Sequence, residues 1–302
     1  MRMFENANFS FIANRRKAYV VSAILVLVSI GSLITRGLEL GIDFKGGMEF
    51  VVETSGELNA VSVRSQLTPA LGAEPEVKTF DDANQLLIRT AAEGEIETVE
   101  AAIVRTIAGE YPGSNPTVVK TDIVGPRFAD DLKQGALYSV LGSLLVIFIY
   151  ILIRFEWRFG MGAVVALFHD VLITLGAFSL LRGVLPFSLQ IDQTIIAAFL
   201  TIVGYSINDT VVVFDRIREY SNLFKTETYS NLVNRSINNT LSRTIITSGT
   251  TLLVVVVLFI FGGEVLRGFA FALLLGIGIG TYSSIFVASP IVVELRARAS
   301  RA

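Results

Sequence analysis

The side chains of this sequence that could do chemistry are ionisable groups within long apolar runs. Asp209 is the first of them, since it follows Tyr205 and Asn208 and is soon followed by four consecutive apolar residues. A carboxylate at membrane depth costs roughly 2.5 to 3.5 kcal/mol unless it is neutralised, paired or hydrated. Asp209 is therefore the first candidate for a functional residue. The alternative is an acid at the frayed end of a span, within reach of water.

Hydroxyl and amide groups accompany Asp209 at helical spacing. Thr201, Tyr205, Asn208 and Val212 share one helix face with it or border that face. A polar path is therefore predicted to run along this helix toward the acid.

Arg243 is the second candidate, because it opens an apolar run that carries hydroxyl residues at helical spacing. Thr240, Thr244, Thr247 and Thr251 form a stripe that continues from the arginine into the run. Such a stripe is typical of a wet path between helices. Two alternatives stay open: Arg243 as a cytoplasmic anchor, and the hydroxyls as hydrogen-bonding groups between packed helices.

His169 and Asp170 form a third candidate pair near the middle of another apolar run. Neighbouring helix residues point about 100° apart, so the two side chains are predicted to contact different neighbours rather than each other. Histidine titrates near neutrality, which makes a proton relay a hypothesis for this pair. For His169 alone, a hydrogen-bonded packing residue is the favoured interpretation.

The composition excludes several other kinds of site. The chain has no cysteine and one histidine, so disulfides, thiolate metal sites, a cysteine nucleophile and histidine metal clusters are excluded. A nucleophile, a base and an orienting residue cannot be assembled by spacing, so an enzyme is not predicted and neither a metal nor a cofactor is expected.

Membrane-spanning helices must hold these side chains. Of 302 residues, 52% are hydrophobic and 17% are charged, whereas soluble proteins average about 25% charged residues. About 20 apolar residues cross the hydrocarbon core as a helix. Because lipid offers no hydrogen-bond partners, a single apolar segment must satisfy its backbone groups internally, which only a helix does. The predicted fold class is an α-helical polytopic membrane protein. Six spans are predicted, at residues 18–35, 135–153, 160–181, 194–214, 244–263 and 268–293.

The distribution of basic residues predicts the orientation. Fourteen Lys and Arg residues lie on one side of the spans, and two, Arg182 and Arg267, lie in the short loops opposite. Basic flanks stay in the cytoplasm, so both termini are predicted to be cytoplasmic. The first span follows a basic leader but offers no small-residue cleavage site, so it is predicted to be retained.

Residues 36–134 predict an extracytoplasmic domain between the first two spans, with residues 1–35 and 135–302 as the flanking membrane parts. This loop holds nine basic and 17 acidic residues, which is typical of a solvated surface. The predicted strands are 48–54, 77–80, 85–91 and 117–124, the helices are 58–71 and 96–107, and a turn is predicted at 81–84. The order β-α-β-β-α-β predicts a small α+β domain with ferredoxin-like topology.

Small residues recur every four positions in the last predicted span. Gly276, Gly280 and Ser284 lie on one face with Ala272 and Ala288. Such a seam lets another helix approach closely, so these residues predict helix packing rather than chemistry.

Several motifs together resemble one family. In chain order they are residues 41–47 (GIDFKGG), 124–126 (VGP), 154–159 (RFEWRF), the His169-Asp170 pair, 204–216 (GYSINDTVVVFDR) and 242–244 (SRT). They resemble the SecD/SecF family of bacterial protein-export proteins, within the resistance-nodulation-division superfamily. The first methionine and the basic leader favour a separate SecF-type subunit over half of a fused SecDF chain.

The resemblance implies one six-helix half with its small domain in the periplasm. It implies a multi-pass protein of the bacterial inner membrane that works beside a SecD half at the Sec channel, SecYEG, on unfolded exported polypeptides. Lipid is an expected partner and nucleic acid is not. Asp209 would bind the coupling ion, H⁺ or in some members Na⁺, with Arg243 as its partner on the next helix. The implied junction with the periplasmic domain consists of Gly41, Asp43, Gly46 and Gly47.

The leading hypothesis is an accessory of protein export that uses the proton motive force. Two alternatives stay open. One is half of a small-molecule exporter of the same superfamily, against which the small size of the loop domain argues. The other is a scaffold of the Sec channel without ion flux. One charge falling through 100 mV yields roughly 2.3 kcal/mol, comparable to the gap between two conformers, so a single proton could bias a switch.

Overall fold

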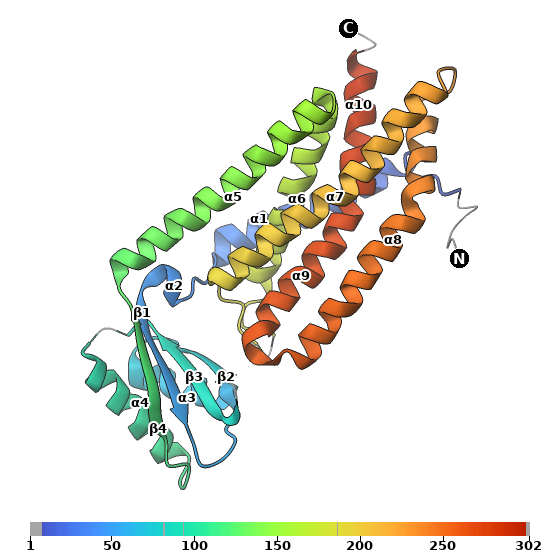
Figure 1. Ribbon diagram of the computed structural model, residues 1–302. Helices are drawn as coiled ribbons and strands as arrows, with labels where there is room; N and C mark the ends of the chain where they lie inside the picture. The colour runs from blue at the N-terminus through green and yellow to red at the C-terminus, as the bar shows by residue number, and fades with distance from the viewer. Residues whose placement is uncertain (1–7, 81, 93, 186, 300–302) are drawn as a thin grey trace.

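The computed structural model describes residues 8–80, 82–92, 94–185 and 187–299 (Figure 1). Within this part of the chain, six helical segments are long and apolar enough to cross a membrane. The sixth of them runs without a break through three elements. The segments are α1 (Arg15–Arg36), α5 (Pro126–Arg154), α6 (Trp157–Leu181), α7 (Gln193–Leu223), α8 (Tyr229–Phe261), and α9 (Gly263–Ser283) with η1 (Ser284–Ala288) and α10 (Ser289–Ala299).

Several helices extend beyond the predicted spans. α5 begins at Pro126, well before residue 135, because a proline fits the first position of a helix, where its missing N–H is not needed. α7 continues to Leu223 and α8 already begins at Tyr229. Hydropathy marks the part of a helix that matches the hydrocarbon core, whereas the backbone hydrogen bonds continue into polar sequence.

α6 lies at the centre of the bundle, where it packs against α1, α5, α7 and α9. More than half of the apolar stretch in the last span, 56%, is buried, against 6% in α5. Figure 1 shows α5 running along one side of the bundle, with its lower end above the sheet. The outward faces of α1, α5 and α8 carry exposed Leu, Ile and Val side chains, as lipid contact requires.

The segment between α1 and α5 forms a four-stranded sheet with two helices packed on one face (Figure 1). Its strand order is β2-β3-β1-β4, and each neighbouring pair is antiparallel. The order of elements along the chain is the predicted β-α-β-β-α-β, after a short helix α2 (Ile42–Lys45). The elements are β1 (Gly47–Glu53), α3 (Ala60–Leu71), β2 (Glu76–Phe80), β3 (Asp82–Thr90), α4 (Ile96–Glu110) and β4 (Thr117–Val124).

The predicted turn at 81–84 is wrong in its extent. Strand β3 begins at Asp82, which pairs with Phe80, and the strand includes Asn84. Asp81 lies outside the described residues. Polar residues that are typical of turns can also begin a strand when the hairpin is this short, because the neighbouring strand pairs with their backbone groups.

The core of the sheet domain follows the predicted periodicity. On α4, Val99, Ile103 and Ile107 are buried against the sheet, as their spacing of four residues predicts. The Asn59 side chain caps α3 by accepting hydrogen bonds from the backbone N–H groups of Val61 and Ser62. The opposite face of the sheet carries Glu49, Arg89 and Glu76 in one row and faces the start of α7.

Candidate functional site

Asp209 lies on the buried side of α7, with 3% of its surface exposed. Ser248 of α8 donates a hydrogen bond to Asp209 Oδ2 at 3.1 Å. Thr281 of α9 in turn donates to Ser248 Oγ at 2.7 Å. Three helices therefore meet at this carboxylate. Because α7 continues regularly to Leu223, Asp209 does not lie at a helix end.

Arg243 lies on α8, one of the helices that pack against α7. Among the described residues, no ion pair within 4.0 Å joins the two side chains. Arg243 is exposed and lines an open pocket of about 390 Å³ between α7 and α8, together with Asn208 and Thr240. The pocket thus ends one residue away from Asp209 along α7, with the arginine on its wall.

The residues predicted to form a polar path divide into two sets. Tyr205 reaches across to α8 and donates to Thr251 Oγ1 at 3.4 Å. Thr247 donates to carbonyl oxygens of its own helix, at Arg243 and Thr244.

Thr201 and Asn208 lie on the exposed side of α7, away from Asp209. Thr201 donates to the carbonyl of Ala197 on its own helix. The face that does lead to Asp209 carries Ser206 and Ile202, which are buried. Asn208 and Asp209 are neighbours in the chain, and the structure turns one outward and the other inward.

His169 and Asp170 contact each other, and the prediction that they would contact different neighbours only is wrong. His169 Nδ1 lies 2.9 Å from Asp170 Oδ1, and both residues are buried. The backbone directions differ by about 100°, but an imidazole is long enough to turn back toward the carboxylate that follows it. His169 also contacts another helix, because its Nε2 lies 3.1 Å from Ser22 Oγ of α1.

Asp170 has two further hydrogen-bond partners, both of them serines. Ser206 of α7 donates to Asp170 Oδ2 at 2.6 Å, and Ser283 of α9 donates to the same oxygen at 2.7 Å. Asp170 is 1% exposed. The carboxylate is therefore well satisfied by hydrogen bonds, which is what allows a polar group to lie in a bundle core.

The network extends from His169 to the first helix. Ser22 Oγ lies 3.1 Å from the hydroxyl of Tyr282, which donates to the carbonyl of Ala18 at 2.9 Å. The rings of His169 and Tyr282 are stacked, with centroids 6.1 Å apart. A continuous chain of polar groups thus joins α1, α6, α7 and α9.

Sequence reasoning missed the hydroxyl groups that form the hydrogen-bond networks around Asp209, Asp170 and His169. They are Ser22, Ser206, Ser248, Thr281, Tyr282 and Ser283. Ser206 carried a signal, since it lies three residues before Asp209 on one helix. Its hydroxyl nevertheless binds Asp170 of another helix, a pairing that spacing along one helix cannot reveal.

The small residues of α9 face α7 at close range. A Cβ atom on Gly276 would lie 2.3 Å from Ile202 side-chain atoms, and one on Gly280 would lie 2.9 Å from Ser206 Cβ. Ser284 is buried and donates to the carbonyl of Thr281. The glycines therefore set the distance between the two helices that carry Ser206, Asp209, Thr281 and Ser283.

The junction between α1 and the sheet is hydrogen-bonded to the loop before α7. Gly41 N–H donates to the carbonyl of Ile191 at 2.9 Å, and Ile191 N–H donates to the carbonyl of Glu39 at 2.7 Å. Asp43 Oδ2 accepts from the backbone N–H of Gln193 at 3.0 Å, at the first residue of α7. Asp43 thus satisfies a helix N-terminus that would otherwise lack an acceptor.

Two glycines let the chain pass from α2 into β1. Gly46 has φ of 78° and Gly47 has φ of 150°. A Cβ on Gly47 would lie 2.4 Å from the carbonyl oxygen of Thr90 in the neighbouring strand. The backbone can take this path only without side chains at these positions.

A charged row on the sheet points toward the start of α7. Glu49, Arg89 and Glu76 lie opposite one another on β1, β3 and β2. Arg89 Nε donates to Glu49 Oε2 at 2.7 Å. Burial opposes the charge of Arg89, but Glu76 and Glu49 outweigh it, so the pKa of Arg89 is raised above its usual value.

Asp192 faces this row from the bundle. Its Oδ1 accepts from the backbone N–H of Ile195 at 2.8 Å and caps α7, while Oδ2 lies 3.9 Å from Arg89 Nη1. Burial raises the pKa of Asp192 above its usual value, against the lowering effects of the Ile195 hydrogen bond, Lys78 and Arg89. Asp43 and Asp192 together hold the N-terminus of the helix that carries Asp209.

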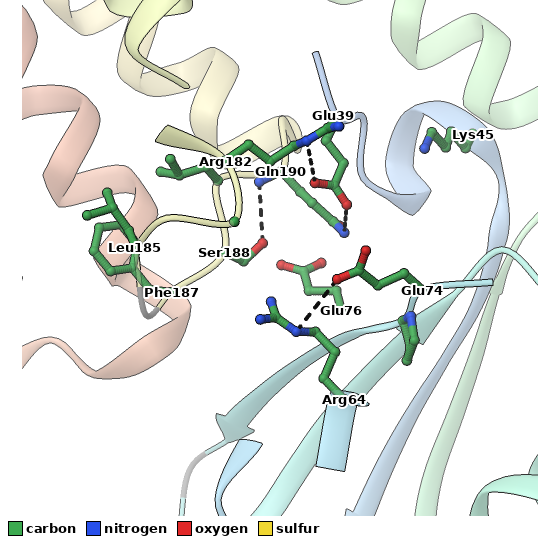
Figure 2. Close-up of a pocket in the computed structure, with 13 residues that line it drawn as sticks. Glu39, Lys45, Arg64, Glu74, Glu76, Arg182, Leu185, Phe187, Ser188 and Gln190 are labelled. Carbon is green, nitrogen blue, oxygen red and sulfur yellow. Dashed lines mark hydrogen bonds and ion pairs between the residues drawn. The ribbon is translucent and has the colours of Figure 1, made fainter. Parts of the chain in front are cut away.

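A polar pocket of about 260 Å³ lies beside this row, between the sheet domain and the loop from α6 to α7 (Figure 2). Within it, Glu39 accepts from Gln190 at 2.8 Å and pairs with Arg182 at 3.8 Å. Arg64 pairs with Glu74 at 3.8 Å on the sheet side. Over the residues that the structure describes, no group of three acidic or histidine side chains could hold a metal ion.

Two family descriptions match this chain. The description "Protein export membrane protein SecD/SecF, C-terminal" matches residues 104–298. The "SecD/SecF GG Motif" matches residues 31–57, which include the glycines of the junction.

Curated relatives and a solved structure agree with this match. The chain is similar to the protein translocase subunit SecF of Rhodothermus marinus, with 72% identity over 99% of this chain and 97% of the relative. The SecF subunit of Desulfurispirillum indicum is 44% identical over 95% of this chain and 92% of its own length. The crystal structure of SecDF, a translocon-associated membrane protein from Thermus thermophilus, superposes with a TM-score of 0.81 and 38% identity. That match covers 99% of this chain but 40% of the SecDF chain. The chain therefore belongs to the SecD/SecF family of protein export membrane proteins.

Proposed function

We propose that this chain is a SecF-type subunit of the bacterial protein translocase. Its relatives are named as such subunits and match it over nearly their whole length. The six apolar helices support a multi-pass protein of the cytoplasmic membrane. The basic flanks support a topology with both termini in the cytoplasm and the ferredoxin-like domain in the periplasm.

A SecD-type half is the proposed partner within the membrane. The SecDF chain that resembles this one is much longer, and this chain accounts for 40% of it. α5 and α8 leave most of their apolar surface uncovered, and α7 exposes Thr201 and Asn208 between them. Polar groups are costly in lipid, so a second protein surface on this side would cover them.

Energy coupling is assigned to the two buried acids, with Asp209 as the primary ion-binding group. The observation that carries this assignment is that Asp209 is 3% exposed and has a serine, not a cation, as its hydrogen-bond partner. A carboxylate in such surroundings is strongly affected by gaining a proton, because protonation removes a buried charge. The bond from Ser248, and through it Thr281, would then rearrange between α7, α8 and α9.

The open pocket between α7 and α8 supports a route for the proton on the side of the basic flanks. Arg243 and Asn208 line this pocket, and Asn208 adjoins Asp209 in the chain. Arg243 would act on Asp209 through water in the pocket rather than by direct pairing. The proposed coupling ion is a proton, which the Asp209 carboxylate would bind directly, and Na⁺ is the alternative.

His169 and Asp170 are the proposed second element of the relay. Their network links α1 and α6 to Ser206, which lies one turn from Asp209 on α7. A change in the packing of α7 would therefore reach α1 as well. The resulting motion would be passed to the periplasmic domain and assist the outward movement of an unfolded polypeptide at the SecYEG channel.

The test is gradient-driven export in vesicles that contain this chain with its SecD partner and the channel. Asp209→Asn should lower the export that depends on the proton gradient by roughly tenfold or more while the protein still inserts and binds its partner. Glu97→Gln, a change of an exposed acid on α4 of the sheet domain, is the matched control and should leave export unchanged. Export of normal rate and normal gradient dependence with Asp209→Asn would remove the coupling role.

A further inference from the structure

The charged row on the sheet has an arginine with two competing partners. Arg89 holds Glu49 by its Nε at 2.7 Å. Its Nη1 lies 3.9 Å from Glu76 Oε2 and 3.9 Å from Asp192 Oδ2. Neither of these two distances is a hydrogen bond, which requires about 3 Å. The same guanidinium nitrogen is therefore placed midway between a carboxylate of the sheet domain and a carboxylate of the bundle.

Each of the two carboxylates has a reason to compete for this nitrogen. Glu76 is almost fully buried, and its Oε2 lacks a hydrogen-bond partner, although Oε1 pairs with Lys78. Asp192 is also buried and uses its other oxygen to cap α7. A buried oxygen without a hydrogen-bond donor is unfavourable. A small shift of the guanidinium toward one carboxylate therefore supplies a donor to that group and leaves the other carboxylate without one.

The two positions differ in what they connect. A bond from Arg89 to Glu76 lies wholly within the sheet domain, across the neighbouring strands β3 and β2. A bond from Arg89 to Asp192 joins the sheet domain to the first turn of α7. The contact with Glu49 persists in both, since it uses a different nitrogen. Arg89 can therefore exchange one partner for the other without losing its place on the sheet.

We infer that Arg89 is a two-position latch between the sheet domain and α7. With Arg89 on Asp192, the domain is held against the N-terminus of α7. With Arg89 on Glu76, the domain is released and turns about the glycine junction at residues 46 and 47. The latch is inferred from the distances around Arg89 alone. Its effect on export, through Asp209 on the same helix, rests on the proposed function.

The pocket in Figure 2 gives such a motion room. Figure 2 shows Glu76 between the sheet-side pair of Arg64 and Glu74 and the loop residue Ser188. The polar space of about 260 Å³ there separates the domain from the loop that leads to Asp192. The walls on both sides are polar, so water can enter as the space opens and hydrate the charged side chains that line it.

The absence of cysteine in this chain makes a clean distance measurement possible. Cysteines placed at Ala108 on α4 and Val184 in the loop between α6 and α7, both exposed, carry spin labels. Pulsed electron paramagnetic resonance then gives the distribution of distances between domain and bundle. The full chain is measured in lipid nanodiscs with its SecD partner and without a proton gradient.

Opposite shifts are expected from the two carboxylate variants. Asp192→Asn weakens the docked position, so the share of long distances should at least double. Glu76→Gln weakens the released position, so the distribution should narrow at the short distance. Arg89→Gln should behave like Asp192→Asn. Arg64→Gln, which breaks an ion pair on the domain side of the same pocket, is the matched control and should change nothing.

The result that overturns the latch is equally definite. If Asp192→Asn and Glu76→Gln both broaden the distribution, the row is a structural contact only, and if neither changes it, Arg89 does not govern docking. Circular dichroism and partner binding confirm that each variant is folded. Because no gradient or export is involved, this outcome is separate from the Asp209→Asn test of the proposed function.

Discussion

Ser206 and Asp209 lie one turn apart on α7, yet they belong to different networks. The hydroxyl of Ser206 donates to Asp170 of α6 at 2.6 Å, whereas Asp209 accepts from Ser248 of α8 at 3.1 Å. α7 is thus the element shared by both buried acids. A displacement of this helix changes the surroundings of both carboxylates together.

Removing Ser206 should therefore cost stability through Asp170. Ser206→Ala leaves Asp170 Oδ2 with Ser283 as its remaining serine donor and should lower the free energy of unfolding by about 1 kcal/mol. Thermal unfolding in detergent measures this. Ser206→Ala combined with Asp170→Asn should cost less than the sum of the two single changes. Strictly additive costs would contradict the contact.

Asp209 should depend on its hydrogen-bond donors for function. Ser248→Ala removes the hydroxyl that donates to Asp209, and Thr281→Val removes the hydroxyl that donates to Ser248. Both changes should reduce gradient-dependent export, the first more than the second. Neither should match the effect of Asp209→Asn, because the carboxylate that takes up the proton remains. Thr250→Val, on the exposed side of α8, is the control. An unaffected Ser248→Ala variant would argue against this network.

The glycines of α9 should differ sharply in their tolerance of alanine. Gly276→Ala places a Cβ 2.3 Å from Ile202 and should destabilise the protein by about 1 to 3 kcal/mol. Gly278→Ala, two residues further on, meets nothing within 4 Å and should be neutral. Comparison of the two unfolding midpoints tests the packing of α7 on α9. Equal midpoints would mean that the helices are further apart than described.

The junction should be as sensitive as the bundle. Gly47→Ala forces a side chain into a backbone with φ of 150° and against the Thr90 carbonyl, so it should cost about 1 to 3 kcal/mol. Gly56→Ala, in an open loop of the same domain, is the control. Protease resistance of the domain in membranes reports the difference. A Gly47→Ala protein as resistant as the control would show that the path through the junction is not tight.

The buried Asp192 should make stability depend on pH in a definite direction. Its pKa is raised in the folded protein from the usual 3.8, mainly by burial. A raised pKa means that its contribution to stability is complete below 3.8 and is lost as pH rises through the folded value. The wild type should therefore gain thermal stability relative to Asp192→Asn as the pH falls from 7 toward 4.

Gly56→Ala, which changes no titratable group, is the comparison for this pH series, and its midpoint should keep a constant offset from the wild type over the same range. A wild-type advantage over Asp192→Asn that grows with rising pH would have the wrong sign and would contradict the burial effect.

The helices and the sheet were largely predictable because their signals are local. The apolar length of each span and the spacing of Val99, Ile103 and Ile107 follow from membrane thickness and helix period alone. The ends of the helices were not predictable from hydropathy. α5 and α8 continue into polar sequence, where the hydropathy falls but the backbone hydrogen bonds persist.

The site was predictable only as far as the acids themselves. Asp209, Asp170 and His169 are conspicuous because ionisable groups in apolar runs are expensive. Their partners come from other helices, and serine is too common in membrane helices to signal a contact. Periodicity also could not separate Asn208 from Asp209, since the two positions lie at opposite borders of the face set by Thr201 and Tyr205, and packing alone decides which of them is buried.

The wide turn η1 in the last span sets an angular offset between its two halves. The side-chain hydroxyl of Ser289 donates to the carbonyl of Ser284 at 2.8 Å, across this π-helical turn. One extra residue in a turn rotates everything beyond it by about 100° relative to an unbroken α-helix. Before the turn, Gly280 and Ser283 face the polar centre, and beyond it Val292 meets Gly162 of α6. If the extra residue moved along the helix, the segment between its old and new positions would swivel by that angle while the ends stayed in place. A shift of the π turn toward the start of the span would therefore turn the Ser283 hydroxyl away from Asp170.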